Sequence, residues 1–251
     1  MRFSDVIVYL TLAVWTASGG VFADRKGPRG SAVFAQGQRV PPPQPPSGEA
    51  PRTIDGKPDL SGVWLRLNVV EPGQPEMLPS AAALYDERRQ NGLRDMPSAR
   101  CLPMGVSLVG PIVTKFVQTA AVLIAIQEGA GTGALQVFLD GRDHPLDLQP
   151  MWRGHSIGTW EGDTLVVDTV GFNDLSWIDA TGLPRSEELH VIERIRRVDF
   201  GHLEIETTID DPGRFVRTWT RRSTSMLAPE EEVQEFVCNE NNQYQPPPVG
   251  K

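Results

Sequence analysis

The sequence predicts an all-β protein. Short runs rich in β-branched and aromatic residues recur at regular spacing from residue 112 onward, tight turns separate them, and one segment alone has a convincing helical pattern. Consecutive short strands of this kind are typical of an antiparallel meander. A meander of about eight to ten strands avoids exposed edges by closing on itself. We therefore expect a lipocalin-like up-and-down barrel, with a β-sandwich as the second choice.

The first residues have the pattern of a secretory signal peptide. The apolar run 6–17 is followed by Ser-Gly-Gly and is too short to span a bilayer comfortably. Cleavage is expected after Ala23, with a second candidate after Ala35. We assign residues 1–23 to the signal and expect an exported protein, periplasmic or secreted. An uncleaved membrane anchor is the alternative.

Segments poor in core-forming residues flank the predicted domain. Residues 24–58 are rich in Pro, Gly, Gln and Ser, which predicts an extended, solvated tether. Residues 242–251 predict a flexible tail. The stretch between them, 59–241, is long enough for one domain with a single core. It contains no internal repeat and no second apolar run of membrane-spanning length, so no stable membrane insertion is expected after signal cleavage.

The domain begins with a short strand at 59–64 and continues into the one helix, at 81–90. Ser80 is the expected N-cap of this helix, and Gly92 follows its end. The remaining elements have strand patterns. They are predicted at 112–119, 121–127, 134–139, 154–160, 164–169, 189–198, 202–209, 215–224 and 232–238.

The chain contains two cysteines, Cys101 and Cys238. In an exported protein an even pair predicts one disulfide, which here would join the region before the central strands to the last strand. A nucleophilic cysteine is the alternative, but neither residue has a neighbouring His or a helix start to activate it.

The formal net charge is −8. An acidic chain without a basic, aromatic-rich patch is a poor candidate for binding nucleic acid or an anionic membrane. A small organic molecule is the partner that we expect instead.

Four sequence blocks resemble one protein family. They are WEGDTLVVDTVGFND at 160–174, DGRDHP at 140–145, LHVIER at 189–194 and DFGH at 199–202. Together they resemble an uncharacterised family of exported bacterial proteins, over about residues 55–241. The resemblance implies a single exported domain, and it implies no activity and no catalytic residues.

Period-two alternation places Glu193 on the more apolar face of the strand 189–198 and His190 on the opposite face. An inward carboxyl group among aliphatic side chains has a raised pKa unless a cation pairs with it, which suits a general acid or base. The alternative is a structural ion pair with an inward arginine such as Arg217. Arg217 shares a face with Trp219, and both are candidate ligand-binding residues.

Asp168 poses the same question, because neither face of the strand 164–169 is plainly polar. It is either a carboxylate in a pocket or a buried hydrogen-bond acceptor, and both interpretations stay open. Asp168, Glu193, His144 and His190 form the candidate catalytic set.

Residues 140–147 gather charged groups between two strands. These groups would line a barrel mouth, with His144 as a proton carrier near neutral pH and Asp140 and Arg142 as ligand-binding groups. One His with scattered Asp residues is weak support for a metal site, so neither a metal nor a cofactor is predicted. A turn held by hydrogen bonds from Asp to the backbone is the alternative.

The segment 171–179 carries two large aromatic side chains beside Asn and Asp. Such a loop suits a lid over an apolar pocket, with Trp177 and Asp174 as ligand-binding candidates. The alternative is a loop that packs its own aromatic side chains onto the core. His155, near the start of the strand 154–160, is a further ligand-binding candidate.

Nucleophilic catalysis has little support. Ser156 occurs in a G-x-S-x-G spacing, but the chain continues as a strand rather than turning into a helix, so we interpret the match as chance. The fingerprints of phosphate loops and dinucleotide sites are absent from the sequence.

Two classes of function follow. In the first, the barrel is an acid–base enzyme, a lyase, isomerase or hydrolase, acting on a small organic substrate; the inward ionisable groups favour this class. In the second, it binds a small apolar ligand without changing it. An envelope scaffold acting through protein contacts is a third possibility. Strand register decides between inward and outward positions, since a slip of one residue reverses every assignment.

Overall fold

The computed structural model describes residues 45–70, 73–129 and 133–238. The chain divides into two units, Met1–Pro42 and Pro43–Lys251. The first unit, with the predicted signal peptide, lies outside the described residues, and so do the predicted tail and the first part of the tether.

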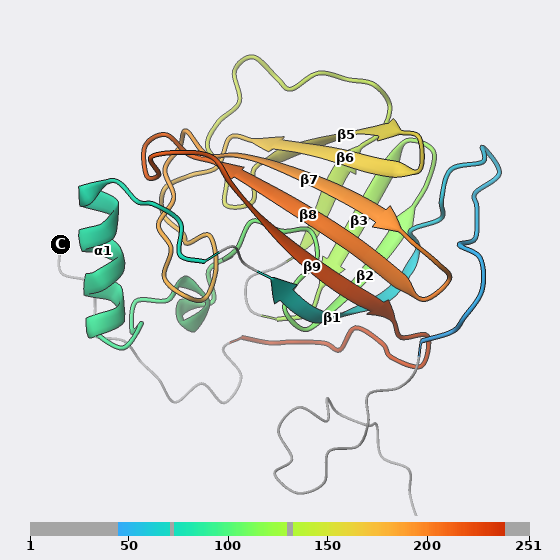
Figure 1. The fold of residues 1–251 in the computed structure, drawn as a ribbon, viewed down its shortest axis with the longest axis horizontal. Helices are drawn as coiled ribbons and strands as arrows, with labels where there is room; N and C mark the ends of the chain where they lie inside the picture. The colour runs from blue at the N-terminus through green and yellow to red at the C-terminus, as the bar shows by residue number, and fades with distance from the viewer. Residues whose placement is uncertain (1–44, 71–72, 130–132, 239–251) are drawn as a thin grey trace, which may run out of the picture. The chain divides into compact units, whose positions relative to one another are not determined.

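The second unit is built on a closed β-barrel, in which each strand pairs with its neighbours in sequence order and β9 pairs with β1 (Figure 1). The prediction of a meander that closes into a barrel is confirmed. The elements are β1 (Gly62–Val70), α1 (Pro79–Gln90), a short 3-10 helix (Pro97–Arg100), β2 (Val113–Gln118), β3 (Val122–Gln127), β4 (Ala134–Phe138), β5 (His155–Glu161), β6 (Thr164–Val170), β7 (His190–Arg197), β8 (His202–Asp210) and β9 (Trp219–Leu227).

One pair of neighbouring strands, β4 and β5, is parallel. A closed ring with an odd number of strands cannot be antiparallel throughout, so at least one parallel pair is required. A parallel pair needs a long crossover connection, and here residues 139–154 supply it by returning along the outside of the barrel, over β5 (Figure 1). This connection carries the charged segment 140–147.

The interior is filled with side chains rather than hollow. On β6, for example, Leu165 and Val167 face inward and are fully buried. The segment before β2 also enters the barrel, because Leu108 and Val109 pack in the same apolar cluster as Trp64. A second apolar cluster, with Phe172, Val191 and Ile209 among its members, fills the space near the other ends of β7 and β8.

Residues before β1 close one end of the barrel. Leu60 is fully buried, and its carbonyl oxygen accepts a 2.9 Å hydrogen bond from Trp64 Nε1. The Arg197 guanidinium lies 5.0 Å from the centre of the Trp64 ring. Part of the predicted tether belongs to the fold, since Arg52 pairs with Asp163 at 2.7 Å. We call this the closed end. The opposite end, next to α1 in Figure 1, borders a cavity, and we call it the open end.

Three local predictions are wrong. The helix begins at Pro79 with Leu78 as N-cap and no side-chain cap, so Ser80 is inside it. The strand predicted at 215–224 begins only at Trp219. The backbone N–H groups of Arg214 and Phe215 donate to Asp211 O, so this part of the chain forms a turn instead. No strand forms at 232–238.

Cys101 and Cys238 form the predicted disulfide, which joins positions 137 residues apart. Cys238 lies beyond β9 rather than in a last strand. Disulfides are typical of oxidising compartments outside the cytoplasm. None of the helices within the described residues is both long and apolar enough to cross a bilayer.

Candidate functional site

A cavity of about 640 Å³ lies at the open end. Its volume is within the range of about 300–1,000 Å³ that is usual for small-molecule sites. It lies between the segment that enters the barrel and the loop that follows β6. The apolar side chains around it include Val69, Met96, Met104, Val106, Ile112 and Ile178.

Three arginine side chains border the same cavity: Arg66 of β1, Arg153 before β5 and Arg221 of β9. Arg221 pairs with Asp179 at 3.1 Å. Arg153 donates hydrogen bonds to the carbonyl oxygens of Met104 and Ser107, each at 2.9 Å. An apolar wall with a few basic groups is the composition expected of a pocket that orients an organic ligand.

Glu193 points into the barrel, as predicted, and is 1% exposed. Its Oε1 accepts from Ser107 Oγ at 2.6 Å and its Oε2 accepts from Leu108 N at 2.9 Å. Thr207 Oγ1 donates a third hydrogen bond to Oε1, at 3.3 Å. Burial raises the pKa of the Glu193 carboxyl group, although these hydrogen bonds and the charges of Arg221 and Arg66 act against the rise.

The contacts of Glu193 describe an anchor rather than an open acid or base. The carboxyl group holds the segment that enters the barrel, and it is not among the groups that border the cavity. The expected ion pair between Glu193 and Arg217 does not form. Arg217 lies before β9, its side chain is 77% exposed, and its nearest carboxylate is Glu76 at 3.7 Å.

The other three candidate catalytic residues meet on the outer face of the barrel, together with His155. His144 lies at the centre of a hydrogen-bonded chain. Its Nδ1 is 2.8 Å from His155 Nδ1, and its Nε2 is 3.3 Å from Asp168 Oδ1. His190 Nε2 lies 2.8 Å from the same oxygen. We call these four residues the outer histidine chain.

The outer histidine chain forms because three strands present outward residues side by side and the crossover connection covers them. His155, Asp168 and His190 come from β5, β6 and β7, and His144 comes from the connection. The outer histidine chain is suited to proton transfer, because a neutral imidazole has one donor nitrogen and one acceptor nitrogen. The barrel wall separates it from Glu193, because His190 and Glu193 lie on opposite faces of β7.

His155 is further held by an aromatic neighbour. Its ring stacks on Phe138 at a centroid distance of 5.4 Å. Partial burial lowers the pKa of His155, and the charges of His144 and Arg142 lower it further. Neutral His155 is therefore the form that the fold favours.

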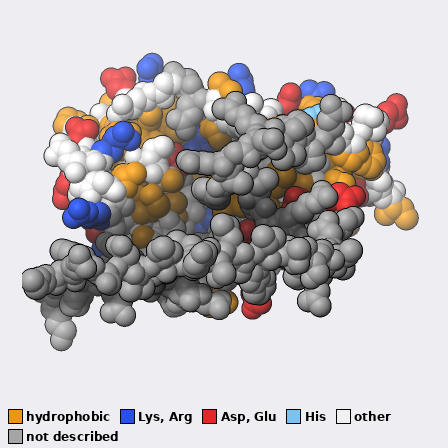
Figure 2. Space-filling model, turned by 90° about the horizontal axis from the view of Figure 1, so that it is seen from below, with side chains coloured by type: hydrophobic (Ala, Val, Ile, Leu, Met, Phe, Trp, Pro, Cys, Tyr) orange, Lys and Arg blue, Asp and Glu red, His pale blue; other side chains and the backbone are white. Residues whose placement is uncertain are grey.

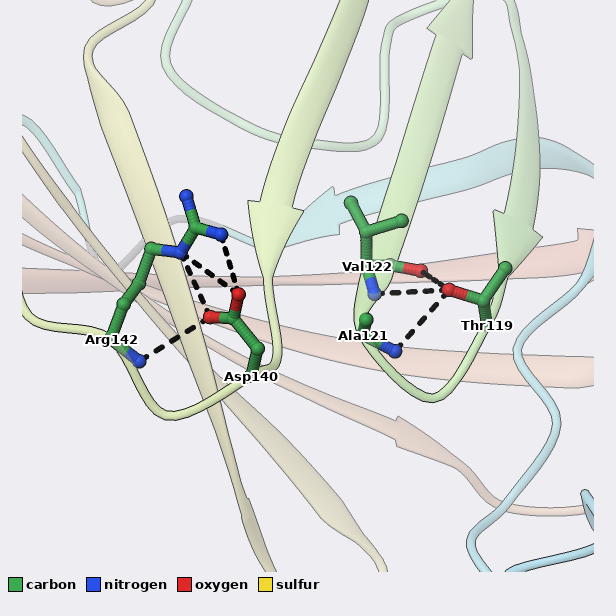
Figure 3. A network of polar contacts seen from close by, with 5 residues as sticks. All are labelled: Thr119, Ala121, Val122, Asp140 and Arg142. Atoms are coloured by element: carbon green, nitrogen blue, oxygen red, sulfur yellow. Dashed lines mark hydrogen bonds and ion pairs between the residues drawn. The ribbon is translucent and has the colours of Figure 1, made fainter.

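Asp140 and Arg142 pair with each other rather than lining the cavity. Figure 3 shows the Arg142 guanidinium facing the Asp140 carboxylate, with Nε–Oδ1 at 2.9 Å, beside the turn that joins β2 to β3. The Arg142 guanidinium also lies 3.9 Å from the centre of the Phe138 ring. The expectation that these two residues line the barrel mouth is wrong, because the connection starts at the closed end and neither residue borders the cavity.

The loop after β6 packs its aromatic side chains onto the core. Trp177 is 3% exposed, so it is not an open lid, whereas Asp174 is exposed to solvent. Trp219 is 8% exposed and stacks edge-on against Phe215 beneath the open end. The alternative in which this loop covers its own aromatic residues is the one that the structure adopts.

A second hollow, of about 460 Å³, lies on the outside of β6 to β9. Charged residues that already pair with one another line it, such as Arg222 with Glu206 at 2.6 Å. The face of the molecule in Figure 2 likewise mixes basic, acidic and apolar side chains in its coloured part. Arg194, which also lines the hollow, pairs with Glu161 at 2.8 Å.

Sequence reasoning missed all three arginines that border the cavity, Arg66, Arg153 and Arg221. Arg66 lies two residues after the buried Trp64, so the alternation of a longer first strand would have placed it inward. Arg153 lies in the crossover connection, where no periodic pattern applies.

Within residues 45–70, 73–129 and 133–238, no group of three or more His, Cys, Asp or Glu side chains has the arrangement of a metal site. No family model, curated protein or solved structure matches this chain.

Proposed function

We propose that the protein is an exported binding protein that holds a small, largely apolar organic molecule at the open end of its barrel. The observation that carries the proposal is the cavity of about 640 Å³, with its apolar wall and its few polar groups. A lipocalin-like role of this kind places the ligand at the mouth of the barrel. The apolar cluster around Leu60 and Trp64 at the closed end serves as a rigid support.

Binding is preferred to catalysis because the predicted catalytic groups are divided between two places. Glu193 anchors a segment inside the barrel, whereas His144, Asp168 and His190 lie on the outer face. The cavity itself contains no histidine.

A titration with the neutral fluorescent probe phenylnaphthylamine tests the proposal. The probe should bind with one-to-one stoichiometry. Val69→Trp, which fills the cavity from its partly exposed rim, should weaken binding by at least about tenfold. Val117→Trp is the matched control, because Val117 is similarly exposed, at 38% against 40% for Val69, and does not border the cavity. Absence of binding, or an equal loss in both variants, would overturn the proposal.

An acid–base enzyme is the second candidate, and the outer histidine chain is the observation that favours it. Its hydrogen bonds join three of the four residues first considered catalytic. If this candidate holds, the purified protein hydrolyses an activated ester such as p-nitrophenyl acetate, and His144→Asn reduces the rate to that of buffer. A rate that is unchanged in His144→Asn eliminates the chain as a catalyst of this reaction.

A further inference from the structure

We propose that the ligand of the open-end cavity is an organic acid, with its anionic group held by Arg66 and Arg153 and its apolar part against the cavity wall. This inference rests on the proposed function and adds the chemical class of the ligand. Its basis is the charge of the groups that border the cavity.

Arg66 enters the barrel from β1, next to the buried Trp64. Its guanidinium donates to the Val109 carbonyl oxygen, and no carboxylate lies within ion-pair distance of it among the described residues. Its Nε is buried, with no hydrogen-bond partner in the part of the chain that the structure describes. Burial lowers the pKa of Arg66, and the nearby charge of Arg221 lowers it further, yet a guanidinium stays protonated in proteins.

Arg153 reaches the cavity from the crossover connection. Its partners are the carbonyl oxygens of Met104 and Ser107 and, at 3.3 Å, the amide oxygen of Gln127, all of them uncharged. Burial lowers the pKa of Arg153 to about 10, and the charge of Glu193 is the one influence that raises it. Two desolvated cations therefore face the cavity, and no carboxylate among the described residues contacts either of them.

The nearby acidic groups have other partners. Glu193 accepts from Ser107 and Leu108, and Asp179 pairs with Arg221. Glu128 also borders the cavity, but its carboxylate accepts a hydrogen bond from Gln234 N. The charges that influence Arg66 and Arg153 are instead those of Glu193, Asp179 and Arg221.

A buried charge is costly unless an opposite charge meets it. A carboxylate or sulfonate on the ligand supplies that charge, and guanidinium groups bind these anions through paired, charge-assisted hydrogen bonds. The apolar wall formed by Val106, Ile112 and Ile178 matches the remainder of such a molecule.

The test compares decanoate with decanol as competitors of bound phenylnaphthylamine on the wild-type protein. The two compounds share their chain and differ in charge. Decanoate should displace the probe at a concentration at least about tenfold lower than decanol does. Equal potency of the two compounds, or stronger displacement by decanol, would overturn the inference of an organic acid. The proposed binding function would still stand in that case, because the probe itself binds. Failure of the probe to bind would instead overturn the proposed function.

A substitution then assigns the preference to its residue. Arg66→Met should reduce the advantage of decanoate over decanol to within about twofold, because the hydrogen-bonding charge is replaced by an apolar group. Arg222→Met is the control, since Arg222 pairs with Glu206 on the outer face and its side chain is 76% exposed. If Arg66→Met folds and keeps the full preference, Arg66 does not hold the anion. If it fails to fold, the wild-type competition still decides the ligand class.

Discussion

Glu193 shows how burial and hydrogen bonding act in opposite directions on one carboxyl group. Burial disfavours its charged form, and the donors Ser107 and Leu108 favour it. The net result is a raised pKa. The folded state therefore binds the proton of Glu193 more tightly than the unfolded chain does, and this contribution to stability is lost as the pH rises from below the unfolded pKa through the folded one.

Glu193→Gln imitates the protonated form and should remove this dependence. The unfolding free energy of the wild type, minus that of the variant, should fall as the pH rises from about 4.5 to about 7.5, measured by urea denaturation. Glu204→Gln, on the exposed side of β8, is the control and should show no such trend. A difference that stays constant with pH contradicts the buried, proton-binding state of Glu193.

His155 gives a pH dependence of opposite sign. Partial burial lowers its pKa, so the unfolded chain binds the proton more readily than the folded protein does. Stability should therefore decline as the pH falls below about 6.5. In His155→Phe, which keeps a ring against Phe138, thermal unfolding should be less sensitive to acidification between about pH 7.5 and pH 5. An equal decline in both proteins would show that His155 is not responsible.

The residues differ in how far the sequence could predict them. Alternation along one strand correctly placed Glu193 inward and His190 outward, because the period of a strand is local. The contact between His144 and Asp168 was out of reach, because it depends on a connection that crosses the outer face. That crossing follows from the number of strands in the ring, which no local pattern contains.

At the scale of the elements, the barrel depends on close packing where the parallel strands β4 and β5 meet. Gly158 of β5 faces inward here, and a Cβ atom added to it would lie 2.6 Å from Leu139 Cδ2 and 2.9 Å from Val137 Cγ1. Both distances are shorter than real Cβ contacts. The close approach of these strands therefore depends on a residue without a side chain.

Gly158→Ala should lower the unfolding free energy by about 1–3 kcal/mol, because the added methyl group forces its neighbours apart. Thr159→Ala, at the next and exposed position, should change it by no more than about 0.5 kcal/mol. Denaturation in urea measures both. A Gly158→Ala protein as stable as the wild type would contradict the close packing of Gly158 against Val137 and Leu139.

The strands that the sequence predicted well are those that form hairpins with short turns, such as β5 with β6 and β7 with β8. The errors cluster where tertiary contacts override a local pattern. The segment 232–238 has the alternation of a strand, yet Phe236 and Val237 are more than half exposed. The disulfide, rather than strand pairing, fixes the end of this run.

At the scale of the whole molecule, one covalent bond closes a loop of more than 100 residues that contains most of the barrel. Cys101 precedes β2 and Cys238 follows β9. In the chain-entropy model a loop of this length stabilises the fold by about 4–5 kcal/mol, mainly by restricting the unfolded chain.

The double variant Cys101→Ser, Cys238→Ser should lose about this amount of unfolding free energy, measured in urea under non-reducing conditions. The wild type with dithiothreitol should approach the variant. Equal stability of variant and oxidised wild type would mean that the bond does not restrict the unfolded chain.

The whole barrel has two different ends. Leu60 and Trp64 fill one end. At the other end, the segment anchored by Glu193 borders a cavity that has three arginines beside an apolar wall. The most direct test is a crystal structure of the full chain with bound phenylnaphthylamine. We predict the probe between Val106 and Ile178 at the open end. A probe found only in the charged hollow outside β6 to β9 would contradict the assignment of the ligand site to the barrel mouth.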